Sequence, residues 1–310
     1  VTADFNRDGH LDIATLNLAG DISVLIGNGD GTFQAAANYG VGGLSSNQSP
    51  LGMAVGDFNR DRIPDLVLAV TDQSLAAVLI GNGDGTFKSA RFYGTDKVVM
   101  SVAVGDFNGD SILDWVASTN ATNTTMVAFG RGDGSFDAAR SYVPFTLNDF
   151  GQITHGLSPS SVAISDLNKD GSPDLVVVDQ GNNNVTVFLN NRDGTFNEAA
   201  NYHVEVAGTM VAAGDFNGDG SPDVVVGLSQ SFGNHSIEVF LGNGDGTFQG
   251  GVVFNVSNTG DGIPVTALAV ADVNGDGKLD VITNSATPQS NAFLYVLLGN
   301  GNGTFQTGIA

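Results

Sequence analysis

The stretch Gly214–Val226, GDFNGDGSPDVVV, places three aspartates and an asparagine directly before a run of valines. Its acidic part has the frame Asp-x-Asn-x-Asp-x-x-x-Asp. This nine-residue frame occurs six times, beginning at Asp4, Asp57, Asp106, Asp166, Asp215 and Asp272. A second motif, GNGDGTF or a close variant, follows each copy and ends at Phe33, Phe87, Phe136, Phe196, Phe248 and Phe305. The chain is therefore built from repeats with a period near fifty residues.

Each repeat carries four short segments that are typical of strands. The first apolar run after the acidic frame, such as DLVLAV from Asp65 or DVVVG from Asp223, suits a strand buried on both faces. A second run leads into the Gly-Asp-Gly motif, a strong hairpin signal. A third run carries an aromatic residue, and a fourth enters the next acidic frame. The repeat predicts an all-β fold, a β-propeller of four-stranded antiparallel blades.

Six copies favour six blades in a single domain, residues 1–310, with seven blades as the alternative. The last copy stops at Ala310 and only three residues precede Asp4. Either the two ends complete one blade between them, or the sequence was cut from a longer ring. Because strand direction alternates, the acidic frame and the Gly-Asp-Gly turn are expected on one face, and the remaining connections on the opposite face.

Composition excludes several classes of function. The chain has 310 residues and no cysteine, which rules out disulfides, thiolate metal sites and cysteine nucleophiles. A net charge of −22 would repel nucleic acid, so no nucleic-acid partner is expected. No apolar run reaches the roughly 18 residues that a membrane span needs, so no membrane insertion is expected.

The acidic frame offers carboxylates at positions 1, 5 and 9, an amide oxygen at position 3 and a backbone carbonyl at position 7. About six oxygen ligands of this kind favour Ca²⁺ over Mg²⁺. An EF-hand would need Glu at position 12, where this chain has Thr, Leu, Ala or Val. The alternative is that these loops are ordinary turns, because Asp and Asn cap backbone groups. Arg62 and Ser111 replace glycine at position 6, and we expect those two sites to be weaker.

The loops DFNGDGSPD and DVNGDGKLD, with the GNGDGTF turns, resemble the FG-GAP (VCBS-type) repeats of integrin α-chain propellers and of many secreted bacterial proteins. The resemblance covers all six copies. It implies about six Ca²⁺ ions per chain, bound at the hairpin between the first two strands of each blade, with ligands meeting the opposite face. Together with the affinity expected of extracellular calcium modules, it predicts an extracellular, secreted or cell-surface protein.

Carried over position by position, the resemblance implies the following metal ligands, in which the residue at position 7 contributes its carbonyl. They are Asp4, Asn6, Asp8, His10 and Asp12; Asp57, Asn59, Asp61, Ile63 and Asp65; Asp106, Asn108, Asp110, Ile112 and Asp114; Asp166, Asn168, Asp170, Ser172 and Asp174; Asp215, Asn217, Asp219, Ser221 and Asp223; and Asp272, Asn274, Asp276, Lys278 and Asp280.

The segments expected on the opposite face differ from repeat to repeat. They are 40–50, 119–125, 143–161, 229–236 and 284–291. Their amides, hydroxyls and few aromatics suit a carbohydrate or protein ligand, although tolerant loops would look the same. We therefore predict a calcium-stabilised extracellular binding module of lectin-like or adhesion type. The oligomeric state does not follow from the sequence.

The alternatives are a propeller-type polysaccharide lyase or hydrolase, and a purely structural spacer. Most cationic residues lie inside the acidic loops or the neighbouring turns, which disfavours an enzyme. Convergence of His155, His203 or His235 with Lys97 in one pocket would support one. The RGD tripeptide at Arg131–Asp133 occupies the turn motif, so we assign it to turn chemistry.

Overall fold

The structure is a computed structural model of the whole chain. It describes residues 1–17, 20–41, 50–70, 74–95, 98–119, 124–142, 145–147, 153–155, 159–229, 235–257, 264–285 and 293–309. The contacts between Cα atoms divide the chain into two compact units, Val1–Val143 and Pro144–Ala310.

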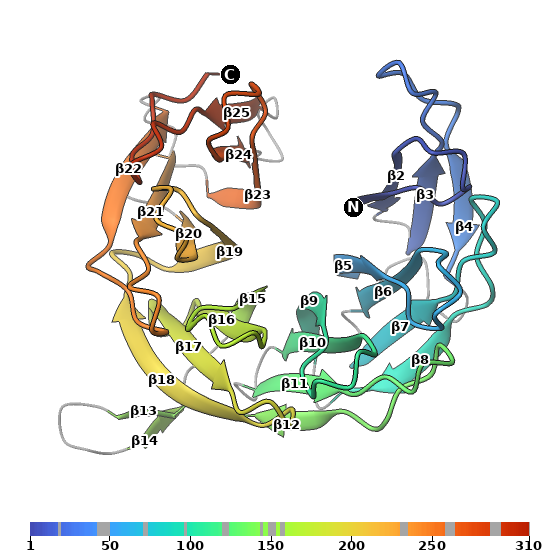
Figure 1. Cartoon of the computed structure of the whole chain (residues 1–310), viewed down its shortest axis with the longest axis horizontal. Coiled ribbons are helices and arrows are strands. Elements are labelled where there is room, and N and C mark those ends of the chain that lie inside the picture. Colours follow the sequence, from blue (N-terminus) through green and yellow to red (C-terminus); the bar gives the residue numbers. More distant parts are fainter. Residues whose placement is uncertain are drawn as a thin grey trace. The chain divides into compact units, whose positions relative to one another are not determined.

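The first unit holds three four-stranded sheets (Figure 1). The first contains β1 (Thr2–Ala3), β2 (Asp12–Leu16), β3 (Asp21–Leu25) and β4 (Ala37–Gly40). The second contains β5 (Pro50–Gly56), β6 (Asp65–Val70), β7 (Leu75–Leu79) and β8 (Arg91–Gly94). The third contains β9 (Val99–Gly105), β10 (Asp114–Thr119), β11 (Thr124–Ala128) and β12 (Arg140–Tyr142).

The second unit opens with a two-stranded hairpin of β13 (Phe145–Leu147) and β14 (Ile153–His155), followed by three blades. The fourth blade contains β15 (Pro159–Ser165), β16 (Asp174–Asp179), β17 (Asn184–Asn190) and β18 (Phe196–His203). The fifth contains β19 (Gly208–Gly214), β20 (Asp223–Leu228), β21 (His235–Phe240) and β22 (Val252–Ser257). The sixth contains β23 (Val265–Ala271), β24 (Asp280–Ser285) and β25 (Phe293–Leu297), and Ile309 bridges Val296 where its fourth strand would run.

Within every blade the strands pair antiparallel in chain order, and the described residues contain no helix. The predicted class, an all-β propeller of six four-stranded antiparallel blades, is therefore confirmed. Each end of the chain pairs inside its own blade, since Thr2 faces Ile13 and Ile309 faces Val296. The hairpin of β13 and β14 was not predicted, because segment 143–161 was interpreted as an irregular connection.

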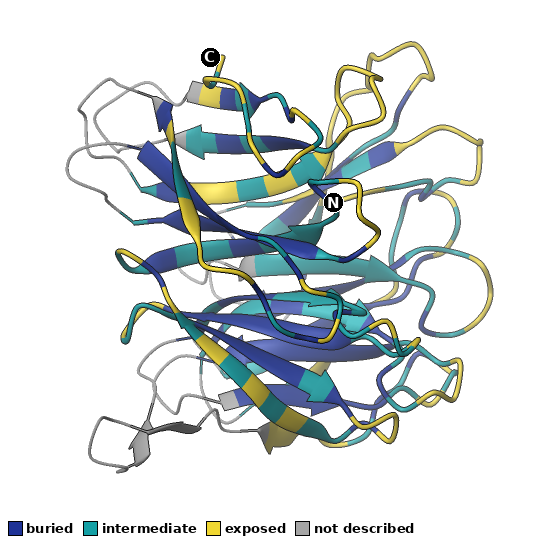
Figure 2. Cartoon of the chain, turned by 60° about the vertical axis from the view of Figure 1, so that its left-hand side comes forward, coloured by how far each residue is buried: buried dark blue, intermediate teal, exposed yellow. Residues whose placement is uncertain are grey.

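The second strand is completely buried in the second to fifth blades. Every residue of β6, β10, β16 and β20 is buried, as the dark blue central strands of Figure 2 show. This agrees with the nearly continuous apolar runs that follow the acidic frames. For β6 and β20, burial on both faces arises because each packs against a neighbouring blade on either side within its unit.

Aromatic contacts join each blade to the next one in the same unit. Phe136, from the turn of the third blade, packs edge to face against Phe58 and Tyr93 of the second, with ring centroids 5.2 and 5.5 Å away. Phe87 and Phe305 make the equivalent contacts with the preceding blade. The Phe248 N–H also donates to the Tyr202 hydroxyl at 2.7 Å. These ring contacts between the repeated Phe and Tyr residues therefore stabilise the packing of consecutive blades within a unit.

A buried glutamate in the fifth blade gives a prediction about pH. Glu238 on β21 accepts a hydrogen bond from the Glu205 N–H at 3.1 Å, and burial raises its pKa above the ordinary value of 4.5. The folded state therefore holds this proton more tightly than the unfolded state, so Glu238 lowers stability as pH rises through 4.5. We expect Glu238→Gln to gain stability relative to the native protein between pH 4 and pH 7, measured by urea unfolding. A difference that does not change with pH would contradict this.

Candidate metal centre

The acidic loops connect the first and second strands of each blade, and the Gly-Asp-Gly turns connect the third and fourth. The aspartate at position 9 joins the two connections. Asp65 is completely buried, and its two carboxylate oxygens accept the N–H groups of Phe58 in the loop and Gly81 in the turn, both at 2.8 Å. The same pair of bonds forms at Asp12, Asp114, Asp174, Asp223 and Asp280. This confirms within each blade that loop and turn lie at the same end.

A further bond ties the loop to the next blade in the same unit. The second glycine of the turn donates its N–H to the carbonyl at loop position 2 of the preceding blade. The pairs are Gly85 to Phe5, Gly134 to Phe58, Gly246 to Leu167 and Gly303 to Phe216, at 3.0–3.1 Å. The conformation of one acidic loop therefore affects the contact between two blades.

The side chains at positions 1, 3 and 5 accept hydrogen bonds from backbone N–H groups of their own loop. In the fifth loop, Asp215 and Asn217 direct a side-chain oxygen to the same N–H, that of Asp219, at 3.2 and 2.9 Å. Asp219 in turn accepts the Ser221 N–H at 2.7 Å and the Asn217 side-chain amide at 2.9 Å. The other five loops repeat the two bonds to the position-5 N–H and the bond from the position-7 N–H to the position-5 carboxylate. The oxygens of positions 1 and 3 are thereby brought together at an exposed point of the loop.

Positions 4 and 6 of the loop both adopt left-handed backbone conformations. In the third loop, Gly109 has φ 75° and Ser111 has φ 62°, and in the second loop Arg62 has φ 64°. Glycine adopts this region without steric cost, whereas other residues are strained there. The loops without glycine at position 6 therefore keep the common conformation, and whether they bind metal more weakly stays a prediction.

The strain at position 6 can be measured with a reciprocal pair of substitutions. Ser111→Gly should stabilise the protein by roughly 0.5–1 kcal/mol, because relief of left-handed strain exceeds the entropy that glycine adds to the unfolded chain. Gly171→Ser should destabilise it by a similar amount, since a Cβ at Gly171 has open space and only its φ of 89° opposes the change. Denaturant unfolding in chelator compares the two, and shifts of the same sign would contradict the argument.

The carboxyl groups at positions 9 and 5 of several loops have pKa values shifted in opposite directions. Burial raises the pKa of Asp65, Asp114 and Asp174 to about 6, in spite of the two backbone N–H groups that each accepts. Hydrogen bonds, first from the Ser221 N–H, lower the pKa of Asp219 at position 5. The fifth loop thus combines a buried carboxyl, Asp223, whose pKa is raised by burial, with an exposed carboxyl, Asp219, whose pKa is lowered by hydrogen bonds.

The donor set fits a hard cation, because the loop offers only oxygen ligands and each carboxylate oxygen that accepts one bond retains a further lone pair. Among the residues that the structure describes, however, no three carboxylates or imidazoles are grouped closely enough to hold a metal ion between them. The loop bonds are also those of Asp- and Asn-based turns. Calcium binding at the six loops therefore stays a prediction.

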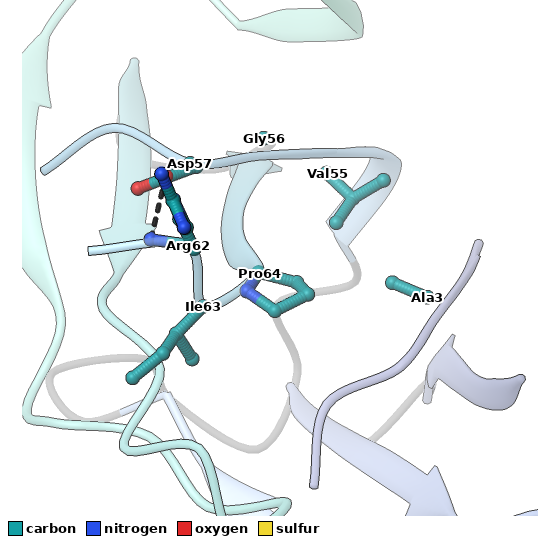
Figure 3. Close-up of a pocket in the computed structure, with 7 residues that line it drawn as sticks. All are labelled: Ala3, Val55, Gly56, Asp57, Arg62, Ile63 and Pro64. Carbon is teal, nitrogen blue, oxygen red and sulfur yellow. Dashed lines mark hydrogen bonds between the residues drawn. The ribbon is translucent and has the colours of Figure 1, made fainter. Parts of the chain in front are cut away.

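A cavity of about 230 Å³ lies beside the second loop, between the first and second blades (Figure 3). Its lining consists of Ala3, Val55, Gly56, Asp57, Arg62, Ile63 and Pro64. Ala3, Val55 and Pro64 give it an apolar wall, and the Arg62 N–H donates to Asp57 at 2.7 Å. No histidine lines the cavity beside the Asp57 carboxylate. The lining therefore offers no pair of groups for acid–base chemistry.

The residues considered for catalysis do not converge where the structure describes them. His203 is exposed on β18, whereas His235 is buried against Tyr295 and lies 3.4 Å from the Thr283 hydroxyl. Lys97 and the His155 side chain lie outside the described residues. In the RGD tripeptide, Arg131 pairs with Asp137 and Asp133 accepts two bonds from Ser135, which is turn chemistry.

The segments expected to form a binding face lie largely outside the described residues. These are 42–49, 120–123, 148–152, 156–158, 230–234 and 286–292. The prediction that this face holds the ligand site is therefore not tested by the geometry.

The blades and their Asp-Asn loops define the class of the protein as a β-propeller with acidic hairpin loops. The chain matches the FG-GAP-like repeat over residues 4–68, 57–117, 166–226 and 215–283, and it belongs to this family. Comparison with curated proteins gave no match. The described residues include no helix of the length and apolarity needed to cross a bilayer.

Solved structures share the fold. A lectin of Agrocybe aegerita, solved to explain recognition of non-reducing terminal N-acetylglucosamine, is 24% identical with a TM-score of 0.66, over 100% of this chain and 78% of that one. A Lactobacillus plantarum protein is 15% identical with a TM-score of 0.62, over 95% and 78%. BBS1N in complex with ARL6DN is 11% identical with a TM-score of 0.54, over 96% and 90%. These similarities show the fold alone.

Proposed function

We propose that this chain is a calcium-stabilised, extracellular, non-catalytic binding module whose ligand is a carbohydrate. The observation that carries the calcium part is the arrangement of the fifth loop: aspartate and asparagine oxygens converge on one exposed N–H, in the same loop as a buried carboxylate, Asp223, whose oxygens accept backbone N–H groups. A divalent ion would neutralise this charge. Three carboxylates within one loop repel each other until a cation is bound.

Calcium would act on the blades as well as on the loops. Each position-9 aspartate joins loop to turn, and four of the turns donate to the loop of the preceding blade in the same unit. Fixing the loop therefore fixes both contacts. Extracellular modules of this kind bind calcium at about 10⁻⁴–10⁻³ M, which corresponds to calcium levels outside cells.

The carbohydrate part is supported by the lectin from Agrocybe aegerita, which covers the whole of this chain. BBS1N, which is similar in fold, was solved in complex with ARL6DN, so a protein ligand is the second candidate. An enzyme is less well supported, since His203 and His235 lie in different environments.

A glycan array with the purified chain tests the proposal, with millimolar Ca²⁺ and with chelator. We expect binding of a glycan class, including sugars with terminal N-acetylglucosamine among those tested, without release of any product. Binding should fall in chelator. Cleavage of a bound glycan would refute a non-catalytic role, and failure to bind any glycan would refute the carbohydrate assignment and favour a protein ligand.

A further inference from the structure

The Gly-Asp-Gly turn of the fourth blade differs from the other five. It reads NNRDGTF, so Asn190 and Arg192 stand where the other turns have glycine. A Cβ at the first of these glycines would lie only 2.4 Å from a carbonyl oxygen in the case of Gly81. In the fourth blade the Asn190 side-chain amide instead donates to the Pro173 carbonyl at 3.1 Å. This turn therefore holds two side chains at positions where the other five turns have glycine.

Arg192 retains the left-handed conformation of the glycine that it replaces. Its φ is 67°, against 78° at Gly83 and 75° at Gly244. A side chain in this region is strained, and such strain persists where other contacts hold the residue in place. In this turn, those contacts are with the acidic loop of the same blade.

The Arg192 guanidinium reaches Asp170, the position-5 residue of the fourth loop. One terminal nitrogen donates to the Asp170 carbonyl, and Nε lies 3.6 Å from carboxylate oxygen Oδ2. This oxygen also accepts the Asn168 side-chain amide at 3.2 Å. The second lone pair of Oδ2 therefore faces a cation supplied by the protein.

The second loop lacks this arrangement. Asp61 accepts the same loop bonds, from the Ile63 N–H and the Asn59 side-chain amide, and forms no ion pair among the described residues. Arg60 crosses to the third loop but donates only to the carbonyls of Asp110 and Ser111. In the sixth loop, Lys278 lies 3.9 Å from Asp276 and belongs to the loop itself. Among the described loops, the fourth is the only one whose position-5 carboxylate lies beside a guanidinium that comes from a separate turn.

We propose that Arg192 is a built-in cation of the fourth acidic loop, which keeps this loop ordered without metal and weakens its affinity for calcium. The inference rests on the proposed calcium function. A fixed positive charge beside Oδ2 repels an incoming divalent ion and occupies one of its ligand positions. The sites of one chain are therefore unequal, and the fourth blade remains formed when calcium is scarce.

The test uses the full chain and two matched variants. Arg192→Gln removes the charge and keeps a side chain in the left-handed position, so strain is unchanged. Arg131→Gln removes one charge from the turn of the third blade, where the guanidinium pairs with Asp137 and touches no acidic loop. Calcium is titrated against a chromophoric chelator, with metal counting, and amide hydrogen exchange is followed at residues 166–174 and 57–65 in excess chelator.

We expect the fourth site of the native chain to bind calcium more weakly than the sites of the other loops that have glycine at position 6. Arg192→Gln should tighten that site roughly threefold to tenfold. In chelator, exchange at 166–174 should be slower than at 57–65 in the native chain and should become equally fast in Arg192→Gln. Arg131→Gln should change neither quantity.

Three results would overturn the inference. If the fourth site binds as tightly as the other sites with glycine at position 6 and Arg192→Gln changes nothing, the role of Arg192 fails while calcium binding stands. If neither protein binds calcium, the proposed function fails too. Unaltered exchange at 166–174 in Arg192→Gln would show that the loop does not depend on the guanidinium.

Discussion

Replacing Asp65 with alanine should destabilise the first unit by about 3 kcal/mol, even when no calcium is present. The substitution leaves the Phe58 and Gly81 N–H groups without their acceptor at a completely buried position. An unpaired buried donor costs roughly 1–3 kcal/mol. The gain from removing a buried carboxylate, whose pKa burial raises to about 6, offsets part of that cost.

Two control variants separate this structural role from metal binding. Asp84→Ala removes a carboxylate from the turn of the same blade that also accepts a backbone N–H, that of Thr86, but in an exposed position. It should cost less than about 1 kcal/mol. Asp57→Ala removes the position-1 carboxylate and should matter mainly with calcium. Urea unfolding in chelator that finds Asp65→Ala no worse than Asp84→Ala would disprove the role of Asp65.

Most of the fold could be predicted from the repeat itself. A periodic frame followed by β-branched runs and a Gly-Asp-Gly turn fixes strand number, order and direction, and these are local features. The hairpin Phe145–Leu147 with Ile153–His155 was missed, because it occurs once and has no repeat to mark it. Its β-branched residues on either side of NDFGQ were the available signal.

The site could be predicted only in part. The sequence indicates which oxygens gather in a loop, but it does not show that Asp65 joins the loop to the Gly81 N–H, since that depends on which residues face each other in the folded blade. The same holds for the contact between Phe136 and Tyr93 of consecutive blades. The sequence places Arg192 in the turn NNRDGTF, but its contact with Asp170 depends on the three-dimensional fold.

Millimolar calcium should raise the melting temperature of the chain strongly, which is the largest effect that we expect. Ligand that binds only the folded state adds RT ln(1 + [L]/Kd) for each site. With dissociation constants of about 10⁻⁴–10⁻³ M, roughly 10 mM calcium contributes about 1.4–2.7 kcal/mol per occupied loop. Since each kcal/mol shifts the melting temperature by roughly 2–4 °C in units of this size, three loops in one unit predict a rise of about 10 °C or more.

Two controls test whether the calcium-dependent rise in melting temperature comes from the acidic loops. Mg²⁺ at the same concentration should stabilise the chain far less, because it retains water and demands octahedral geometry that these ligands do not impose. Asp57→Asn with Asp106→Asn should reduce the calcium-dependent rise and leave the melting temperature in chelator nearly unchanged, since both side chains are exposed loop acceptors. Metal counting should find close to six ions per native chain. If calcium and chelator give the same melting temperature and no ion is retained, the aspartates act as turn formers, and the extracellular assignment loses its physical basis.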